Sequence, residues 1–530
     1  MNKRFVFSIA GMFLLLVAGA GWIPHQRDIQ SAQSAAAVLA LATTQKDATK
    51  ANSESLSTQI AHLSALMLAP ATGPVPGAPS QGDADLRVEW ARQRGELMQQ
   101  LAKTDPKAFL LNVIPETSWA KLPAAAQAAV ERRTQIRGIV VVLHIDDFSN
   151  PRNSRFEYHL HSGNRQLNLH FAGNSPALLS GTTVEIDGYQ IGESVIATGD
   201  TGGLTIVAAP SPTPESVGLQ NTLAILITAP GQPAHPTKDQ MEALIFNNQF
   251  QQFYEEQSYG KVRFTGHVTD WISVPNDLTT ACGSGIGLEA TPAIRSYIIE
   301  NGIDLAAYNR IVYIVNTGPS GGGCANTGPF DYTFNSKTYH ASFATVGYSD
   351  SAWDRNGMTG FQYVLAHEMG HALGVKHANS WDCSGVSLEN NCWHNEYGND
   401  YDVMGSGRYA AHFNAFYKDY LGWFDTADKV DIRSTGIYSL APIESASGSR
   451  AGIINNPALL ALDPLAQPTY LEYRQPIGFD RLLPERGIGL HINQVIYSGL
   501  FDPFTRIINA NHSSAPTDHY KVLEDRKSVV

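Results

Sequence analysis

The protein has 530 residues, of which 43% are hydrophobic and 9% aromatic, a composition typical of a folded protein. Its length predicts three or four domains. Charged residues make up 16% of the chain and the formal net charge is −12, which bears mainly on solubility. No dense cluster of lysine and arginine appears, so the sequence argues against nucleic acid as a partner.

The first twenty residues predict an export signal. A short positive start, KR, precedes an apolar run from Phe5 to Ala20, which ends in the small-x-small pattern that signal peptidase requires. We therefore expect residues 1–20 to be removed and the mature protein to be secreted, without a membrane partner. The alternative is a periplasmic or cell-surface protein that keeps this segment as an anchor, because the apolar character continues to Ile23.

The region before the central part of the chain divides in two. Residues 21–84 are rich in Ala, Ser, Gln and Thr, which predicts a low-complexity or helical region, and they end in the linker-like stretch ATGPVPGAPSQG. Residues 85–217 predict helices near 85–103 and 124–133, followed by short alternating strands such as RQLNLHFAG and TTVEIDGYQI. We expect a small all-β domain here, a sandwich or a barrel, which ends at the Pro-rich segment APSPTPESVG.

Residues 218–425 alternate between apolar strands and helices, which predicts an α/β (α+β) domain. LAILITA and RIVYIV are expected as buried strands, and helices are expected at Thr237–Gln257 and Gly360–Gly374. Residues 426–530 return to short strands and predict a β-rich C-terminal domain. The last six residues, DRKSVV, coincide with an in-frame translation of a common sequencing adapter, so we expect this domain to be truncated.

The segment HEMGHALGVKH carries the clearest chemistry. His367 and His371 are four residues apart, so on a helix they project from one face and can bind one Zn²⁺. Glu368 lies between them, placed to act as general base on a metal-bound water. Gly374 can end the helix in a left-handed turn, which returns His377 to the metal as the third ligand. The fourth position stays open for water, as a catalytic zinc requires.

Met404, in DYDVMGSG, follows the third histidine by 27 residues. HExxHxxGxxH with a later Met-containing turn resembles the metzincin zinc metallopeptidases, in which this Met lies beneath the zinc. The wider resemblance is to the gametolysin-like family, on YEEQSYGKVRFTGHVTDW, HFNAFYKDYLGW and YLEYRQPIGFD. It implies a metzincin-like catalytic domain over residues 218–425, preceded by a small all-β domain and followed by a β-rich one. The implied zinc ligands are His367, His371 and His377, with Glu368 as the base and Met404 as the structural Met turn.

The resemblance implies a zinc-dependent endopeptidase that hydrolyses peptide bonds with a zinc-activated water. Its partner is then a protein or peptide, which lies extended along an edge strand; we expect Tyr339–Val346 to be that strand. Astacin-like metzincins place a tyrosine two residues after the turn Met, but Ser406 stands there. Tyr401 and Tyr409 are poor substitutes, so no tyrosine is assigned to stabilise an oxyanion. The sequence gives no indication of oligomeric state.

Two other functions compete with this interpretation. In a gluzincin-type peptidase a downstream glutamate supplies the third ligand, and Glu389 and Glu396 are available. That alternative leaves Gly374 and His377 unexplained. The second is a wall-binding or adhesion protein on an inactive protease scaffold, against which the presence of Glu368 argues.

The four cysteines are Cys282, Cys324, Cys383 and Cys392. In an exported protein an even number predicts disulfides, and proximity along the chain favours Cys282–Cys324 and Cys383–Cys392.

Residues 85–217 could also be a pro-region that covers the active site. A cysteine from the pro-region cannot occupy the open zinc position, because no cysteine precedes Cys282. Inhibition would need steric cover, a histidine or a carboxylate such as Asp146 or Asp147. The alternative is a permanent accessory domain. The Pro-rich link near 209–218 is the expected cleavage point.

Overall fold

The computed structural model describes residues 5–8, residues 50–69 and, with gaps of up to ten residues, residues 81–508. The chain forms two compact units. The smaller unit comprises residues 23–142 and 157–210, and the larger unit comprises residues 1–22, 143–156 and 211–530. The segment 143–156 therefore belongs with the larger unit, although the sequence placed it in the N-terminal region.

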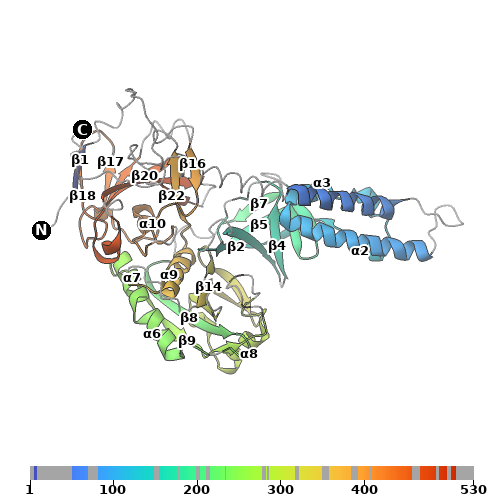
Figure 1. Ribbon diagram of the computed structural model, residues 1–530, viewed down its shortest axis with the longest axis horizontal. Helices are drawn as coiled ribbons and strands as arrows, with labels where there is room; N and C mark the ends of the chain where they lie inside the picture. Colours follow the sequence, from blue (N-terminus) through green and yellow to red (C-terminus); the bar gives the residue numbers. More distant parts are fainter. Residues whose placement is uncertain are drawn as a thin grey trace, which may run out of the picture. The chain divides into compact units, whose positions relative to one another are not determined.

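The smaller unit pairs a helical layer with an antiparallel-rich sheet (Figure 1). Residues 50–68 are helical and pack on α2 (Gln81–Thr104) through a core that includes Leu56, Ile60, Met98 and Leu101. Three short helices follow, α3 (Pro106–Leu111), α4 (Glu116–Trp119) and α5 (Ala124–Gln127). The strands are β2 (Arg132–Asp146), β3 (Arg155–Ser162), β4 (Arg165–Phe171), β5 (Thr182–Ile191), β6 (Ser194–Ala197) and β7 (Leu204–Ala208).

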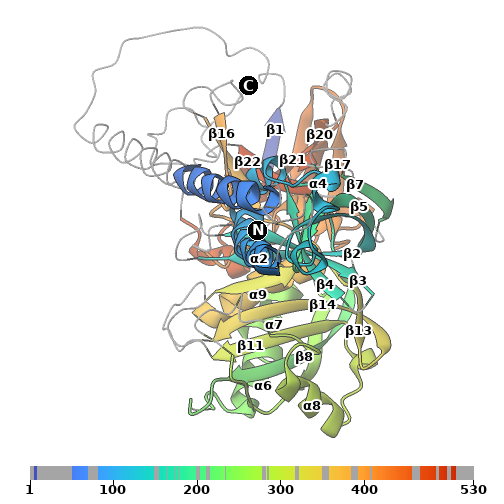
Figure 2. The ribbon, with the colours of Figure 1, turned by 90° about the vertical axis from the view of Figure 1, so that its right-hand side faces the viewer.

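The larger unit is built on a mostly parallel sheet. Strands β8, β11 and β14 run parallel and side by side (Figure 2), β12 is antiparallel to β14, and the last residues of β2 pair with β12. β9 and β10 pair with β8 on its other side, and β13 pairs with β14. The bounds are β8 (Gly218–Thr228), β9 (Val262–Val268), β10 (Ile272–Ser273), β11 (Arg310–Asn316), β12 (Gly323–Asn326), β13 (Phe330–Phe334) and β14 (Lys337–Tyr348).

Continuous apolar runs form the central strands, as is usual for strands covered on both faces. Leu223–Ile227 of β8 and Ile311–Val315 of β11 are buried throughout. Helices α7 and α9 supply the other side of the core, with Phe253, Tyr254 and Leu365 among its members. The helices are α6 (Lys238–Phe246), α7 (Gln249–Gln257), α8 (Pro292–Glu300), α9 (Gly360–Leu373) and α10 (Ala415–Tyr420). Three short 3-10 helices are η2 (Leu305–Ala307), η3 (Thr426–Asp428) and η4 (Gly478–Leu482).

A second sheet completes the larger unit, with strand order β16-β15-β22-β21-β20-β19-β17. Arg474 on β20 is fully buried there, and its guanidinium pairs with Glu472 at 2.8 Å and Asp480 at 3.0 Å. Because this sheet includes β15 and β16, which come before the predicted boundary at residue 425, the C-terminal strands belong to the same compact unit as residues 218–425. The bounds are β15 (Ala378–Cys383), β16 (Cys392–Asn395), β17 (Lys429–Ile432), β18 (Ile437–Leu440), β19 (Ala451–Ile454), β20 (Ala466–Arg474), β21 (Gly489–Tyr497) and β22 (Pro503–Ile508).

The structure corrects three sequence predictions. The helix expected near 124–133 ends at Gln127, and strand β2 begins at Arg132. The helix expected at Thr237–Gln257 is two helices, because Asn247 ends α6 and the side chain of Asn248 caps α7. The expected edge strand, Tyr339–Val346, was also wrong: it lies within β14, which is flanked by β11 and β12. β14 pairs with one side of β12, and the segment Leu143–Asp146 pairs with the other, outer side of β12.

The predicted disulfide Cys282–Cys324 is present and ties β12 to the loop after β10. Cys383 and Cys392 are directly opposite each other in the β15–β16 pair, a placement compatible with a disulfide. Their side chains lie outside the described part of the structure, so this second bridge stays a prediction.

The structure does not test the predicted signal. β1 (Phe5–Ser8) pairs antiparallel with β18, and the other residues of the segment lie outside the described ranges. Among the described residues, no helix combines the length and apolar character that a membrane span requires.

Glu131→Ala should destabilise the smaller unit. The Glu131 carboxylate pairs with Arg94 at 2.5 Å, both side chains are fully buried, and Glu131 also accepts the backbone N–H of Ile114. Removing the carboxylate leaves a buried guanidinium without its counter-ion, a loss of about 3–5 kcal/mol. Urea unfolding followed by far-UV circular dichroism should reveal a clearly lower midpoint.

The control for this variant is Glu89→Ala, which removes an exposed partner of Arg92. Both residues lie on α2, the helix that also carries Arg94. Its effect should be far smaller because water screens exposed pairs. Equal midpoints for the two variants would contradict the prediction.

Candidate metal centre

Helix α9 places the first two histidines. Thr359 caps its N-terminus in a capping box with Gln362, which satisfies backbone donors that the first turn leaves unpaired. Gly374 ends the helix in the left-handed region, with φ 116°, a conformation that costs glycine little. The predicted turn is therefore present, and the chain reverses there so that His377 faces the helix.

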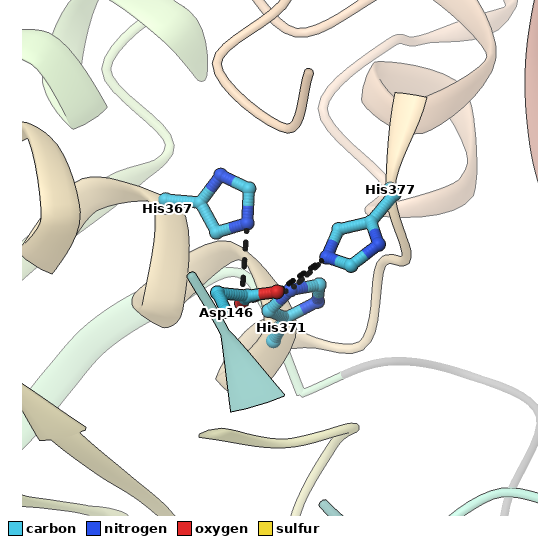
Figure 3. Close-up of side chains that lie close together, drawn as sticks. All are labelled: Asp146, His367, His371 and His377. Carbon is cyan, nitrogen blue, oxygen red and sulfur yellow. Dashed lines mark hydrogen bonds and ion pairs between the residues drawn. The ribbon is translucent and has the colours of Figure 1, made fainter. Parts of the chain in front are cut away.

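Four buried side chains converge on one point (Figure 3). The nearest oxygen of Asp146 lies 3.5 Å from Nε2 of His367, 3.3 Å from Nε2 of His371 and 3.0 Å from Nε2 of His377. The last two nitrogens are 3.1 Å apart. Tetrahedral zinc with bonds of 2.0–2.1 Å separates its ligand atoms by about 3.3 Å, so the spacing of this group fits zinc.

The ring orientation of each histidine is fixed by a hydrogen bond at Nδ1, the ring nitrogen that is not directed at the common point. Nδ1 of His367 donates to the carbonyl of Val403 at 2.8 Å, Nδ1 of His371 donates to the carbonyl of Val375 at 2.8 Å, and Nδ1 of His377 donates to Oε1 of Glu396 at 2.9 Å. Carbonyl and carboxylate oxygens only accept, so each Nδ1 carries the proton. In the neutral form of each ring, Nε2 then presents its lone pair to the common centre, as metal-ligating histidines require.

The electrostatics of the group depend on burial and on two carboxylates. Burial lowers the pKa of His371 to about 4, which keeps that ring neutral near pH 7. Burial acts in the same direction on His377, but the charges of Asp146 and Glu396 outweigh it and raise its pKa to about 9. Because a bound metal needs the neutral ring, a proton and a metal compete at His377.

Glu368 lies against β12. A Cβ at Gly323 would come within 2.3 Å of Glu368 Oε1, so the carboxylate occupies the space that the glycine leaves. Both oxygens are buried and have no hydrogen-bond partner in the described part of the chain. Burial raises the pKa of Glu368 well above its usual range, and the negative charge of Asp146 raises it further. A buried carboxylate without partners is suited to exchanging a proton with a small molecule in the site.

Met404 lies under helix α9. Its expected position beneath a zinc ion stays a prediction. A Cβ on Gly370 would come within 2.4 Å of the Met404 sulfur, so helix and turn are in direct contact. Asp402 stabilises the turn by accepting the backbone N–H groups of Met404 and Asn414. The carbonyl of the neighbouring Val403 receives the proton of His367, so this turn positions a candidate ligand.

Two residues of the site were not assigned by the sequence. The sequence named Asp146 only as one candidate, together with Asp147, for an inhibitory ligand from the pro-region. The available signal was the spacing of His144 and Asp146 in LHIDDF, which puts both side chains on one face of a strand. Tyr397 was missed. Its ring lies 3.8 Å from that of His377 and its hydroxyl donates to Oδ1 of Asp146. It lies further before Met404 than Tyr401, and the sequence comparison considered only Ser406, Tyr401 and Tyr409.

The other residues considered earlier are not in this group. Tyr401 packs in a separate cluster with Ala411 and Leu483, joined by Tyr409. Glu396 contacts the outer nitrogen of His377, so the gluzincin arrangement is not favoured. Ser406 and Glu389 lie outside the described residues.

Residues 239–411 match the family model for metallo-peptidase family M12B, reprolysin-like. The match supports a metzincin-type zinc metallopeptidase. It includes the three histidines, Glu368 and Met404, and it ends before the second sheet is complete. M12B peptidases depend on zinc, in agreement with the chemistry of the histidine group. No curated protein matches the chain, and the narrower resemblance to gametolysin-like enzymes stays a prediction.

Glu396→Ala should weaken metal binding without removing a ligand. The carboxylate fixes the ring of His377, and the loss of such an outer partner typically costs about 10–100-fold in metal affinity. Competition with a chromogenic zinc chelator measures the change. Glu255→Ala, a carboxylate on α7 that bonds to Gln251, is the control. Unchanged zinc affinity in Glu396→Ala would contradict the assignment.

Proposed function

We propose that this protein is a secreted zinc-dependent endopeptidase with Glu368 as its general base. The observation that carries the proposal is the convergence of three Nε2 atoms, each with its Nδ1 proton held by a different acceptor. Glu368 lies next to that group, buried and without a partner among the described residues. Secretion rests on the N-terminal sequence alone.

The residues divide the chemistry of peptide hydrolysis between them. A zinc ion held by His367, His371 and His377 would lower the pKa of a bound water to about 7 and polarise the scissile carbonyl. Glu368 accepts the proton of the attacking water and passes it to the leaving amine. Its position beside the three histidines, in the space that Gly323 of β12 leaves, suits both steps.

Tyr397 is the candidate for stabilising the oxyanion. Its hydroxyl donates to the Asp146 oxygen that lies 3.0 Å from His377 Nε2. A substrate oxygen at that position would receive the same hydrogen bond. The backbone of Tyr397 is in the left-handed region, with φ 59°, and its N–H donates to Asn379. Such a conformation costs a non-glycine residue free energy and is often found at functional sites.

The substrate is expected to lie along the outer side of β12. That strand begins at Gly323, beside Glu368, and its other side is taken by β14. An extended peptide that pairs with the outer side would gain backbone hydrogen bonds and bring its scissile bond to the metal group. Cys282–Cys324 fixes this strand to the body of the domain.

Glu368→Gln should separate binding from chemistry. All three histidines remain, so the variant should keep one zinc per chain, while chelator-sensitive cleavage of unfolded casein should fall by at least about 10³-fold. His377→Ala should instead lose the metal. Metal content by atomic emission and casein cleavage are measured on the same preparations, each as the full chain and after it has been cut in the Pro-rich link near 209–218.

Three outcomes would contradict the proposal. Near-normal turnover in Glu368→Gln would remove the assigned base. Tightly bound zinc in His377→Ala would remove the third ligand and favour a gluzincin arrangement. Wild-type zinc binding without hydrolysis by any form of the chain would favour a binding protein on a protease scaffold.

Tyr397→Phe should lower kcat by about 10²-fold and leave KM nearly unchanged, because the lost hydrogen bond acts mainly on the developing oxyanion. Zinc content should stay at one per chain. Tyr401→Phe, a buried tyrosine outside the metal group, is the control. An equal fall in both variants, or a rise in KM alone, would contradict this role.

A further inference from the structure

We propose that residues 143–148 are a built-in competitor of substrate, and that Asp146 is the fourth protein ligand of the metal in the full-length chain. The proposal rests on the zinc site inferred above. It makes the full-length protein a latent form of the peptidase, inhibited by a carboxylate. All residues that carry it belong to the larger unit.

The carboxylate occupies the place that catalysis needs. Three histidines leave one position of a four-coordinate zinc for water, and a fourth protein ligand converts an open catalytic site into a closed one. Asp146 reaches all three Nε2 atoms within 3.0–3.5 Å, and its side chain is fully buried. A carboxylate that is held among three imidazoles without access to water is therefore placed as a ligand.

The backbone of the same segment occupies the substrate edge. Leu143–Asp146 pairs antiparallel with β12, with Asp146 opposite Gly323 and Leu143 opposite Asn326. These are the backbone groups that an extended substrate would use. Because Asp146 stands opposite Gly323, it also lies next to Glu368, where the scissile bond is expected.

Alternate side chains of the segment cover the histidines. The ring of His144 lies 4.1 Å from that of His371, and the ring of Phe148 lies 4.9 Å from that of His367. Side chains two residues apart point to the same face of an extended chain, so His144, Asp146 and Phe148 fill the site together. Asp147, with the opposite orientation in this pattern, is not in the metal-binding group.

Activation then requires a cut after the smaller unit. The chain leaves the larger unit after Phe156 and returns at residue 211. Ser216 is buried, and its carbonyl accepts the indole N–H of Trp423, so the chain is anchored from there on. A cut between Ala208 and Glu215 breaks the covalent connection between Asp146 and the histidines, and it leaves the anchored part of the chain intact. Residues 210–214, within the predicted link, lie outside the described ranges.

The test uses the full chain with cobalt(II) in place of zinc. Cobalt reports its ligands through visible absorption, and azide is a small probe that needs an open position on the metal. Three chains are compared, all in the Glu368→Gln background to prevent self-cleavage: otherwise unchanged, Asp146→Asn and Asp147→Asn. Azide should change the spectrum of Asp146→Asn at a concentration at least ten-fold lower than in the other two.

A second measurement avoids dependence on one variant. A site for a sequence-specific protease is inserted between Ala208 and Glu215, and the chain is cut and the two fragments are separated. The C-terminal fragment should bind azide as Asp146→Asn does. With Glu368 restored, it should cleave casein, whereas the uncut chain should be inert.

The outcomes separate the two proposals. If no chain binds one metal ion, the proposed function fails and this inference fails with it. If all chains bind metal and azide acts on them equally, or the uncut chain cleaves casein as fast as the fragment, the zinc site stands and latency is overturned. If Asp147→Asn alone opens the site, the ligand has been misassigned.

Discussion

The site depends on one constraint: three imidazole rings must present their Nε2 atoms to one point. Each ring is fixed by a hydrogen bond from Nδ1 to a different part of the chain. His367 donates to Val403 in the Met turn, His371 donates to Val375 just after helix α9, and His377 donates to Glu396 after β16. The left-handed turn at Gly374 makes the arrangement possible, because it lets residues six positions apart face each other. The two sheets and the helix between them are required to hold these acceptors in place.

The second sheet contributes to the same constraint. β15 and β16 lead into Glu396 and Tyr397, and β22 pairs with β15. Tyr417 on α10 donates to the carbonyl of His377. The strands after residue 425 therefore support the histidine that the sequence assigned to the preceding domain. This explains why contacts join the two regions into one compact unit.

Local patterns predicted the helix, its end and the placement of the histidines, because these depend on spacing within about fifteen residues. The Met turn was placed by resemblance, and Cys282–Cys324 by proximity along the chain. Long-range pairing could not be predicted in the same way. The sequence predicted a strand at Tyr339–Val346 and assigned it to the edge, but the residues of a strand do not reveal which strands will flank it. Asp146 reaches the site from a distant part of the sequence, and Tyr397 lies in the segment between His377 and Met404, where no local pattern fixes which side chains face the histidines.

The position of strand β2 in the sequence decides the order in which the residues of the metal group are synthesised. The strand ends at Asp146, whereas the first histidine of the site is His367. A ribosome that adds 5–20 residues per second needs roughly ten to forty seconds to travel between them. The competing carboxylate therefore exists before the histidines do, and β2 can fold with the smaller unit while the rest of the chain is still being made. Under the latency proposed above, a nascent chain built in this order has its competing carboxylate in place before the metal site is complete.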